Sequence, residues 1–227
     1  MDARIGLIGG LSWESTATYY RELNRRYHGT GEWSQPAILV DSLDFARIVD
    51  LQRRGEWRAT GAILADSARR LELAGARVLA ICANTMHINF DDVRRAVNVP
   101  VVDVRDAVAR EVLDAGSSSV ALLGTRYVIE GTFYSNRLAE LGVRTVRPRP
   151  DQIEELQRIV FDELTVGVVS ATSGDYLRDV ALSCLDRGAT TVGLCCTEFG
   201  LLLSEDDGLP VVDSTLAHVR SLLAATS

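Results

Sequence analysis

Short apolar runs alternate with longer amphipathic stretches along almost the whole chain, and this alternation restricts the possible folds more than any other feature. Apolar runs bounded by turn residues are typical of buried parallel strands, whereas apolar residues at helical spacing predict helices. Alternating strands and helices indicate a parallel sheet covered by helices on both faces. We expect strands at Ile5–Ile8, Ala37–Val40, Val78–Ile81, Val101–Val104, Val120–Leu123, Val192–Cys195 and Val211–Val212, and helices at Ser15–Tyr27, Leu51–Leu73, Asp106–Asp114, Thr132–Leu141, Ile153–Val166, Tyr176–Asp186 and Thr215–Leu223.

The sequence also repeats itself. Leu73–Thr85 resembles Asp186–Glu198 at an offset of 113 residues, and Ile5–Gly10 resembles Val120–Thr125 at an offset of 115. Two matches at similar offsets predict two lobes related by internal symmetry, although any two strand–loop–helix units share some likeness. We expect an α/β protein of two pseudo-symmetric doubly wound lobes with parallel sheets, and a ligand cleft between them at the carboxyl ends of the strands. Residues 1–98 with 208–227 form the first expected lobe, and 99–207 form the second.

Composition excludes several classes of protein. All 24 basic residues are arginine and the chain has no lysine, which excludes a pyridoxal-phosphate aldimine, a Walker A loop and a Schiff-base aldolase. The net charge of −7, with scattered basic residues, makes a nucleic-acid partner unexpected. No apolar run is long enough to span a membrane, and Met1–Arg4 leads into the first strand without signal-peptide features. We therefore expect a cytoplasmic protein without a membrane partner.

The four cysteines, Cys82, Cys184, Cys195 and Cys196, form no C-x-x-C pair, and the histidines have no zinc-ligand spacing to them. Neither a disulfide framework nor a bound metal is expected, so each cysteine is either a reactive thiol or a small buried hydrophobe. Cys184 has helical apolar neighbours and is expected in the core.

Four segments carry a resemblance to a known family. They are Gly9–Thr16 (GGLSWEST), Asn84–His87 (NTMH), Leu123–Tyr127 (LGTRY) and Cys196–Glu198 (CTE). In these segments the chain resembles the aspartate/glutamate racemase family, and its subgroup of amino-acid racemases in particular, in the same order and spacing along nearly its whole length.

The resemblance implies a cofactor-independent isomerase acting on an amino acid or a related carboxylate, and a homodimer. Inverting an α-carbon requires removal of its proton on one face and return of a proton on the other, which two acid/base groups accomplish in one binding event. Cys196 matches the catalytic cysteine of the family's second lobe. Thr197 is expected to contact the substrate or the thiolate, and Glu198 either orients neighbouring groups or caps the next helix.

The first lobe departs from the family pattern. Two-cysteine members have a thiol directly before the asparagine, where this chain has Ala83, and the internal repeat likewise aligns Cys196 with Ala83 and Cys82 with Cys195. Adjacent side chains of a strand point to opposite faces, so Cys82 faces away if Ala83 faces the ligand. Three outcomes follow: a one-thiol racemase biased towards one enantiomer, a bulge that brings Cys82 into the site, or a single-cysteine decarboxylase or isomerase.

The remaining site residues come from the resemblance. Asn84 and Thr85 match positions that bind the substrate carboxylate, and Arg47 resembles the arginine that binds a distal carboxylate. An acidic run at Glu154–Glu155 stands where members with acidic substrates often have a lysine, which disfavours strict aspartate or glutamate specificity unless Arg158 compensates. The other expected ligand contacts or supporting residues are Gly10, Ser12, Thr125 and His87. A non-catalytic homologue that only binds an amino acid is the alternative from another functional class.

Overall fold

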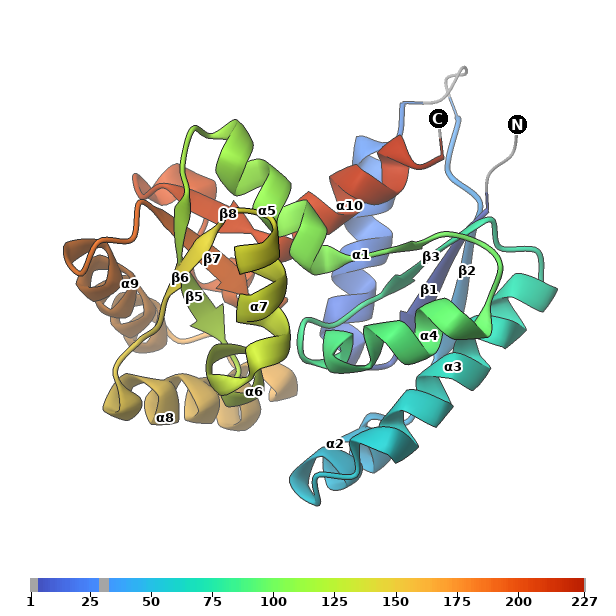
Figure 1. Ribbon diagram of the computed structural model, residues 1–227, viewed down its shortest axis with the longest axis horizontal. Coiled ribbons are helices and arrows are strands. Elements are labelled where there is room, and N and C mark those ends of the chain that lie inside the picture. Colours follow the sequence, from blue (N-terminus) through green and yellow to red (C-terminus); the bar gives the residue numbers. More distant parts are fainter. Residues whose placement is uncertain (1–3, 29–32, 227) are drawn as a thin grey trace. The chain divides into compact units, whose positions relative to one another are not determined.

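The computed structural model describes residues 4–28 and 33–226, so Met1–Ala3 of the expected leaderless N-terminus lies outside the described residues. The chain divides into two compact units (Figure 1). Unit 1 comprises Met1–Asp103 and His218–Ser227, and unit 2 comprises Val104–Ala217.

Unit 1 is a four-stranded parallel sheet in the order β2-β1-β3-β4, with helices on both faces. Helix α1 and the end of α10 cover one face, where Tyr19, Leu23, Val219 and Leu222 pack on the sheet. Helices α2, α3 and α4 cover the other face (Figure 1). The elements are β1 (Ile5–Gly9), α1 (Trp13–Arg26), β2 (Ile38–Ser42), α2 (Phe45–Arg53), α3 (Trp57–Leu73), β3 (Val78–Ile81), the 3₁₀ turn η1 (Thr85–Asn89), α4 (Phe90–Ala96), β4 (Val101–Val102) and α10 (Ser214–Ala224), which begins in unit 2.

Unit 2 has the same architecture, with the strand order β6-β5-β7-β8. Helices α5 and α7 pack on one face of the sheet and α8 and α9 on the other, while α6 contributes Val128 to the core on the first face and Ile129 to the core on the second. The elements are α5 (Val104–Asp114), β5 (Ser119–Gly124), α6 (Arg126–Glu130), α7 (Thr132–Glu140), β6 (Arg144–Val146), α8 (Pro150–Arg158), the π turn η2 (Ile159–Glu163), the 3₁₀ turn η3 (Leu164–Val166), α9 (Ala171–Asp186), β7 (Thr191–Cys195), the 3₁₀ turns η4 (Phe199–Leu201) and η5 (Glu205–Asp207), and β8 (Val211–Asp213).

The two sheets also share their register, which confirms the predicted pseudo-symmetry. Ile8 pairs with Ile81 in unit 1, and Leu123 pairs with Leu194 in unit 2. These pairs are related by the offsets of 115 and 113 residues found in the sequence. The expected α/β class with two doubly wound lobes is therefore correct, while the expected ligand cleft stays a prediction.

The structure differs from the predicted elements in several places, and it contains the short helices α4 and α6, which are not among the predicted helices. The sequence did not predict β6, because this short edge strand begins with Arg144 and lacks a continuous apolar run. The stretch expected as one helix over Leu51–Leu73 contains only the end of α2, which begins at Phe45, and the whole of α3. The two helices are separated at Gly55, whose φ of 69° leaves the helical region. The stretch Ile153–Val166 begins as α8 and ends in the π turn η2 and the 3₁₀ turn η3.

The unit boundaries also differ from the predicted division. Strand β4 pairs with β3 and extends unit 1 to Asp103, beyond the predicted limit at residue 98. Strand β8 pairs with β7, so residues 208–217, which the sequence placed in the first lobe, group with unit 2. A short strand pairs with whichever neighbouring strand has free backbone N–H and C=O groups. The sequence spacing alone did not show that β4 pairs with β3 and β8 with β7.

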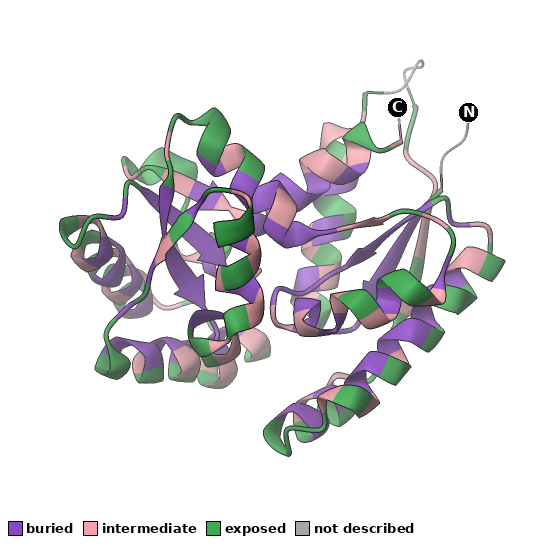
Figure 2. Ribbon diagram, viewed as in Figure 1, coloured by how far each residue is buried: buried purple, intermediate pink, exposed green. Residues whose placement is uncertain are grey.

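The central strands of each sheet are buried (Figure 2). Every residue of β1, β3, β5 and β7 is buried, as expected for strands covered on both faces. Within residues 4–28 and 33–226, no helix combines the length and apolar character needed to cross a membrane.

Candidate active site

The carboxyl end of β7 carries a thiol, a hydroxyl and a carboxylate in succession. Cys196 Sγ donates to Glu198 Oε2 at 3.2 Å, and Thr197 Oγ1 donates to the same oxygen at 2.6 Å. Glu198 is buried, and the chain turns into η4 directly after it, with Phe199 N bonded to Cys196 O. The turn therefore folds the carboxylate back onto the thiol, where it can accept the proton of Cys196.

Cys196 differs from the other cysteines in its surroundings. Its exposed fraction is 6%, whereas those of Cys82, Cys184 and Cys195 are 0%. Burial raises the pKa of Cys196 well above its ordinary value, and the nearby Glu198 carboxylate raises it further. The thiol form is therefore favoured at neutral pH, which suits a group that donates a proton.

The corresponding strand end in unit 1 lacks such a thiol. The two sheets have the same register, so Cys82 in unit 1 is equivalent to Cys195 in unit 2, and Ala83 is equivalent to Cys196. Cys82 packs in the cluster that contains Tyr19 and Leu23, while Ala83 packs in the cluster on the opposite face of the sheet.

This placement argues against the bulge that would carry Cys82 towards a ligand. Cys82 N still bonds to Ile8 O at 3.0 Å, as a residue that continues β3 in register does. Burial raises the pKa of the Cys82 thiol. Cys82 is therefore a core residue by its surroundings, and its expected catalytic role is not supported by them.

The predicted NTMH segment forms the turn η1 directly after Ala83. Asn84 is buried, Thr85 is half-buried and begins the turn, and His87 N bonds to Asn84 O at 3.1 Å. The His87 ring donates from Nδ1 to Ala83 O at 2.8 Å, because a carbonyl can only accept. His87 thus holds the backbone carbonyl of Ala83, the residue equivalent to Cys196.

The loop after β1 is held in an unusual conformation. Gly10 has a φ of 67°, and a Cβ at this position would lie 2.2 Å from Leu43 O. Ser12 has a φ of 123°, which is rare for a residue with a side chain, and its Oγ caps α1 by accepting from Ser15 N at 3.3 Å. Thr16 Oγ1 accepts from Gly10 N at 2.9 Å and donates to Ser12 O at 3.1 Å. Such strain, of about 1–3 kcal/mol, concentrates at functional sites.

The predicted residues thus gather at two strand edges, one in each unit. Because β1 pairs with both β2 and β3, the loops with Gly10, Ser12, Asn84, Thr85 and His87 share one edge of the unit 1 sheet. Gly124 pairs with Cys195, so Thr125, the N-cap of α6, lies at the same edge of unit 2 as Cys196, Thr197 and Glu198.

The sequence singled out two arginines, Arg47 and Arg158, that could pair with the carboxylate of an acidic substrate. Arg47 is exposed on α2 and makes no ion pair with any residue in the described part of the chain. Arg158 donates to Glu155 Oε1 at 2.7 Å and also pairs with Glu163 at 2.7 Å. Its charge is already shared by two carboxylates, so Arg158 does not compensate the acidic run of α8 for an acidic ligand.

Sequence reasoning missed a buried polar cluster in unit 1. Tyr19 and His218, 199 positions apart, are joined by a 2.8 Å hydrogen bond, and the His218 ring lies edge-on to that of His87 at 5.7 Å. His218 Nε2 donates to Val102 O at 3.0 Å, so its Nδ1 accepts from the Tyr19 hydroxyl. The sequence predicts that residues 208–227 join the first lobe, but the spacing of these residues does not signal which side chains of α1 and α10 meet.

The geometry defines a class of protein: a duplicated α/β fold with polar strand-end loops in both halves and, in one half, a buried thiol hydrogen-bonded to a carboxylate. No group of three His, Cys, Asp or Glu side chains that could hold a metal ion occurs in the part of the chain that the structure describes.

Comparison with known proteins gives the family. Residues 8–222 match the Asp/Glu/Hydantoin racemase family, and the chain belongs to this family. A putative Asp/Glu racemase from Yersinia pestis is 36% identical, with 99% of each chain covered and a TM-score of 0.90. PH1733, an aspartate racemase homologue from Pyrococcus horikoshii OT3, is 35% identical over 100% of both chains, with a TM-score of 0.85. The broad specificity amino-acid racemase RacX of Bacillus subtilis (strain 168) is 21% identical over 97% of this chain and 96% of its own.

Proposed function

We propose that the protein is a pyridoxal-independent amino-acid racemase or epimerase whose acid/base group is Cys196. The observation that carries this proposal is the hydrogen bond from the Cys196 thiol to the buried Glu198 carboxylate at the carboxyl end of β7. Family membership and the absence of lysine from the chain support it.

The reaction begins with transfer of the thiol proton from Cys196 to Glu198 Oε2. The thiolate sulfur then takes the α-proton of the bound amino acid, and the electron pair of the C–H bond remains as a carbanion. Because burial disfavours the thiolate, it is a strong base once formed, and the protonated Glu198 can then return the proton. Donors around the substrate carboxylate stabilise the carbanion, and we assign this role to Ser12, Asn84 and Thr85 in unit 1 and to Thr125 and Thr197 in unit 2.

Ala83 makes the proposed chemistry one-sided. A methyl group cannot carry a proton, so water must serve the face of the α-carbon that a second thiol would serve. We expect one enantiomer to exchange its α-proton through Cys196 much faster than it inverts. Arg47 is the proposed contact for a distal polar group, without strict specificity for acidic side chains.

The test is α-proton exchange in heavy water. L- and D-amino acids are incubated with the protein and the loss of the α-proton is followed by NMR, while chiral chromatography follows inversion. Cys196→Ala is expected to abolish exchange. Cys82→Ala, the matched loss of a buried thiol, is expected to leave exchange within about twofold, since Cys82 lies in the core on the other face of its sheet. Equal losses in both variants would refute the assignment of Cys196.

The single thiol also favours a second candidate. A decarboxylase that protonates its carbanion from one side needs only one acid, and Cys196 is held in the thiol form suited to that step. Release of carbon dioxide from an arylmalonate without α-proton exchange of amino acids would favour this activity. Binding of an amino acid without either reaction would identify a non-catalytic homologue.

A further inference from the structure

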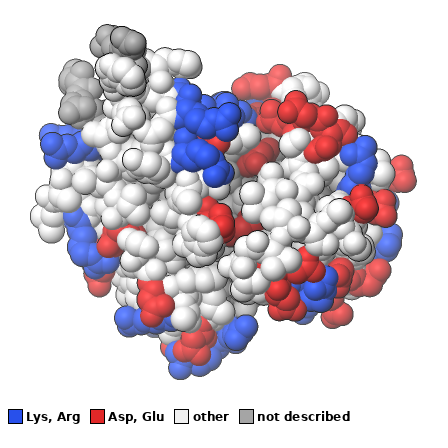
Figure 3. All heavy atoms as spheres, turned by 180° about the vertical axis from the view of Figure 1, so that it is seen from behind, with Lys and Arg blue, Asp and Glu red and all other residues white. Residues whose placement is uncertain are grey.

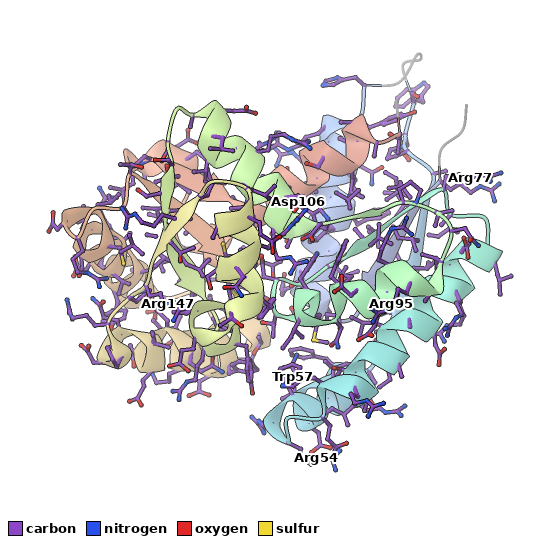
Figure 4. All side chains as sticks on the ribbon, in the orientation of Figure 1. Arg54, Trp57, Arg77, Arg95, Asp106 and Arg147 are labelled. Carbon is purple, nitrogen blue, oxygen red and sulfur yellow. The ribbon has the colours of Figure 1, made fainter. Side chains whose placement is uncertain are left out.

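A groove on unit 2 collects four arginines. It is a cavity of about 870 Å³ formed by α7, the strand β6 and the segment that leads into α8. Arg144, Arg147, Arg149 and Arg187 line it, together with small and neutral residues, and no acidic residue of the described chain does. Figure 4 labels Arg147, the residue directly after β6.

Neutral acceptors hold these guanidinium groups in place. Arg187 Nη2 donates to Arg147 O at 2.6 Å and Arg144 Nη2 donates to Gly188 O at 2.7 Å. Arg187 Nε donates to Ser183 O at 3.1 Å, and Arg149 Nη1 donates to Ser183 Oγ at 3.0 Å, so these two side chains converge on one residue. Such bonds orient an arginine without neutralising it.

The groove therefore keeps an uncompensated positive charge. Within the described chain, only Arg149 among the four has a carboxylate within ion-pair distance, at 3.5 Å from Asp151. Elsewhere, arginines lie beside acidic groups, as several do on the face in Figure 3, and as Arg95 does with Asp92 at 2.7 Å. Unit 2 has ten arginines and eighteen acidic residues, a net charge of −8, so four arginines in one groove run against its overall charge.

Like charges held together repel, and a bound anion removes that repulsion. The planar guanidinium group binds phosphate oxygens in pairs, and several such groups suit a compact ligand with several negative charges. Helix α8 begins at the groove, and its first-turn N–H groups add positive potential there.

We propose that this groove binds a small polyphosphate, the chemistry shared by inorganic triphosphate and the phosphate chain of a nucleoside triphosphate. The site is separate from the proposed catalytic residues of unit 2, since none of Thr125, Cys196, Thr197 and Glu198 lines the groove. In this proposal unit 2 binds an anionic effector or an anionic part of a substrate, and this binding does not depend on which reaction Cys196 performs.

Isothermal titration calorimetry of the full chain with inorganic triphosphate, ATP and orthophosphate tests the proposal. We expect triphosphate to bind at least about tenfold more tightly than orthophosphate, because more guanidinium groups engage it. ATP binding like triphosphate identifies recognition of the phosphate chain alone, and tighter ATP binding adds recognition of the nucleoside. Either result supports the site.

Arg147→Ala is the decisive variant, because within the described chain its guanidinium group makes an exposed hydrogen bond to Ser135 Oγ, at 3.3 Å, and pairs with no carboxylate, so we expect the variant to fold. We expect about tenfold weaker triphosphate binding in Arg147→Ala and a similar loss in Arg144→Ala. The matched control, Arg95→Ala, removes an exposed arginine of unit 1 and should leave binding within about twofold. No binding at millimolar triphosphate, equal loss in Arg95→Ala, or equally tight binding of duplex DNA would overturn the proposal.

Discussion

The buried His218 makes the stability of unit 1 depend on pH in a way that can be calculated. Burial, reinforced by the neighbouring His87, lowers the pKa of His218 to about 3, against about 6.5 for an exposed histidine. Both ring nitrogens are occupied in the neutral form, with Nδ1 accepting from Tyr19 and Nε2 donating to Val102 O. Protonation would leave Nδ1 carrying a hydrogen that faces the Tyr19 hydroxyl in place of a lone pair.

The sign follows from where the proton binds. Below pH 6.5 the unfolded chain takes up a proton at His218 and the folded chain does not, so the unfolded state gains free energy as the pH falls. Stability is therefore fully present above pH 6.5 and is lost progressively down to the folded pKa of about 3. Integrating from pH 7 to pH 5 gives a loss of about 2 kcal/mol from this one group.

Urea unfolding followed by tryptophan fluorescence measures this loss. All three tryptophans, Trp13, Trp33 and Trp57, lie in unit 1, so their emission reports on the unit that contains His218. The wild-type chain should lose about 2 kcal/mol more than His218→Gln between pH 7 and pH 5, since the variant has no imidazole to protonate.

Comparison of the two chains removes the contribution of the carboxylates, which both share. His28→Gln, which replaces an exposed histidine, should keep the wild-type pH dependence. If wild type and His218→Gln differ by less than about 0.5 kcal/mol over this range, His218 is not held neutral by the fold and the reasoning fails.

Three further substitutions test the site. Ala83→Cys places a thiol at the position equivalent to Cys196 and should raise inversion relative to α-proton exchange, as measured by chiral chromatography beside NMR; unchanged inversion would show that Ala83 does not face the substrate. Glu198→Gln should lower exchange about 100-fold by removing the proton acceptor, and should shift the alkylation of Cys196 to lower pH because the carboxylate raises that pKa. Gly10→Ala should destabilise the chain by more than about 2 kcal/mol in urea unfolding, whereas Gly55→Ala, at a similar φ of 69° with no atom within 4 Å of its new Cβ, should cost only about 1 kcal/mol.

Much of the fold follows from the sequence because its central strands are buried on both faces. Val78–Ile81 was predicted with its exact observed limits, since a fully buried strand must be continuously apolar. Strand β6 was not predicted because an edge strand needs only one neighbour and tolerates charged residues such as Arg144. Apolar patterns therefore predict edge strands less well than central strands.

The candidate site divides in the same way. That Cys82 and Ala83 point to opposite faces follows from strand alternation alone, and the clusters in which they lie agree with it. The bond between Cys196 and Glu198 required the turn after β7, whose path depends on backbone angles that residue types do not specify. The sequence placed the last helix in the first lobe, but the contact of Tyr19 with His218 depends on how α10 packs against α1, which no local pattern specifies.

Helix α10 has a consequence for how the chain acquires its fold on the ribosome. It starts with Ser214 bonded to Leu194 O of unit 2, and its last turns, with Val219 and Leu222, complete the core around Ile5 and Leu7. Strand β1 thus waits for α10, which is synthesised after unit 2, and the sheet of unit 2 can form before unit 1 is complete. A nascent chain stalled just before residue 214 would contain every strand of unit 2, while the apolar residues of β1 in unit 1 would still lack their cover from α10, and this is the form that chaperones would meet.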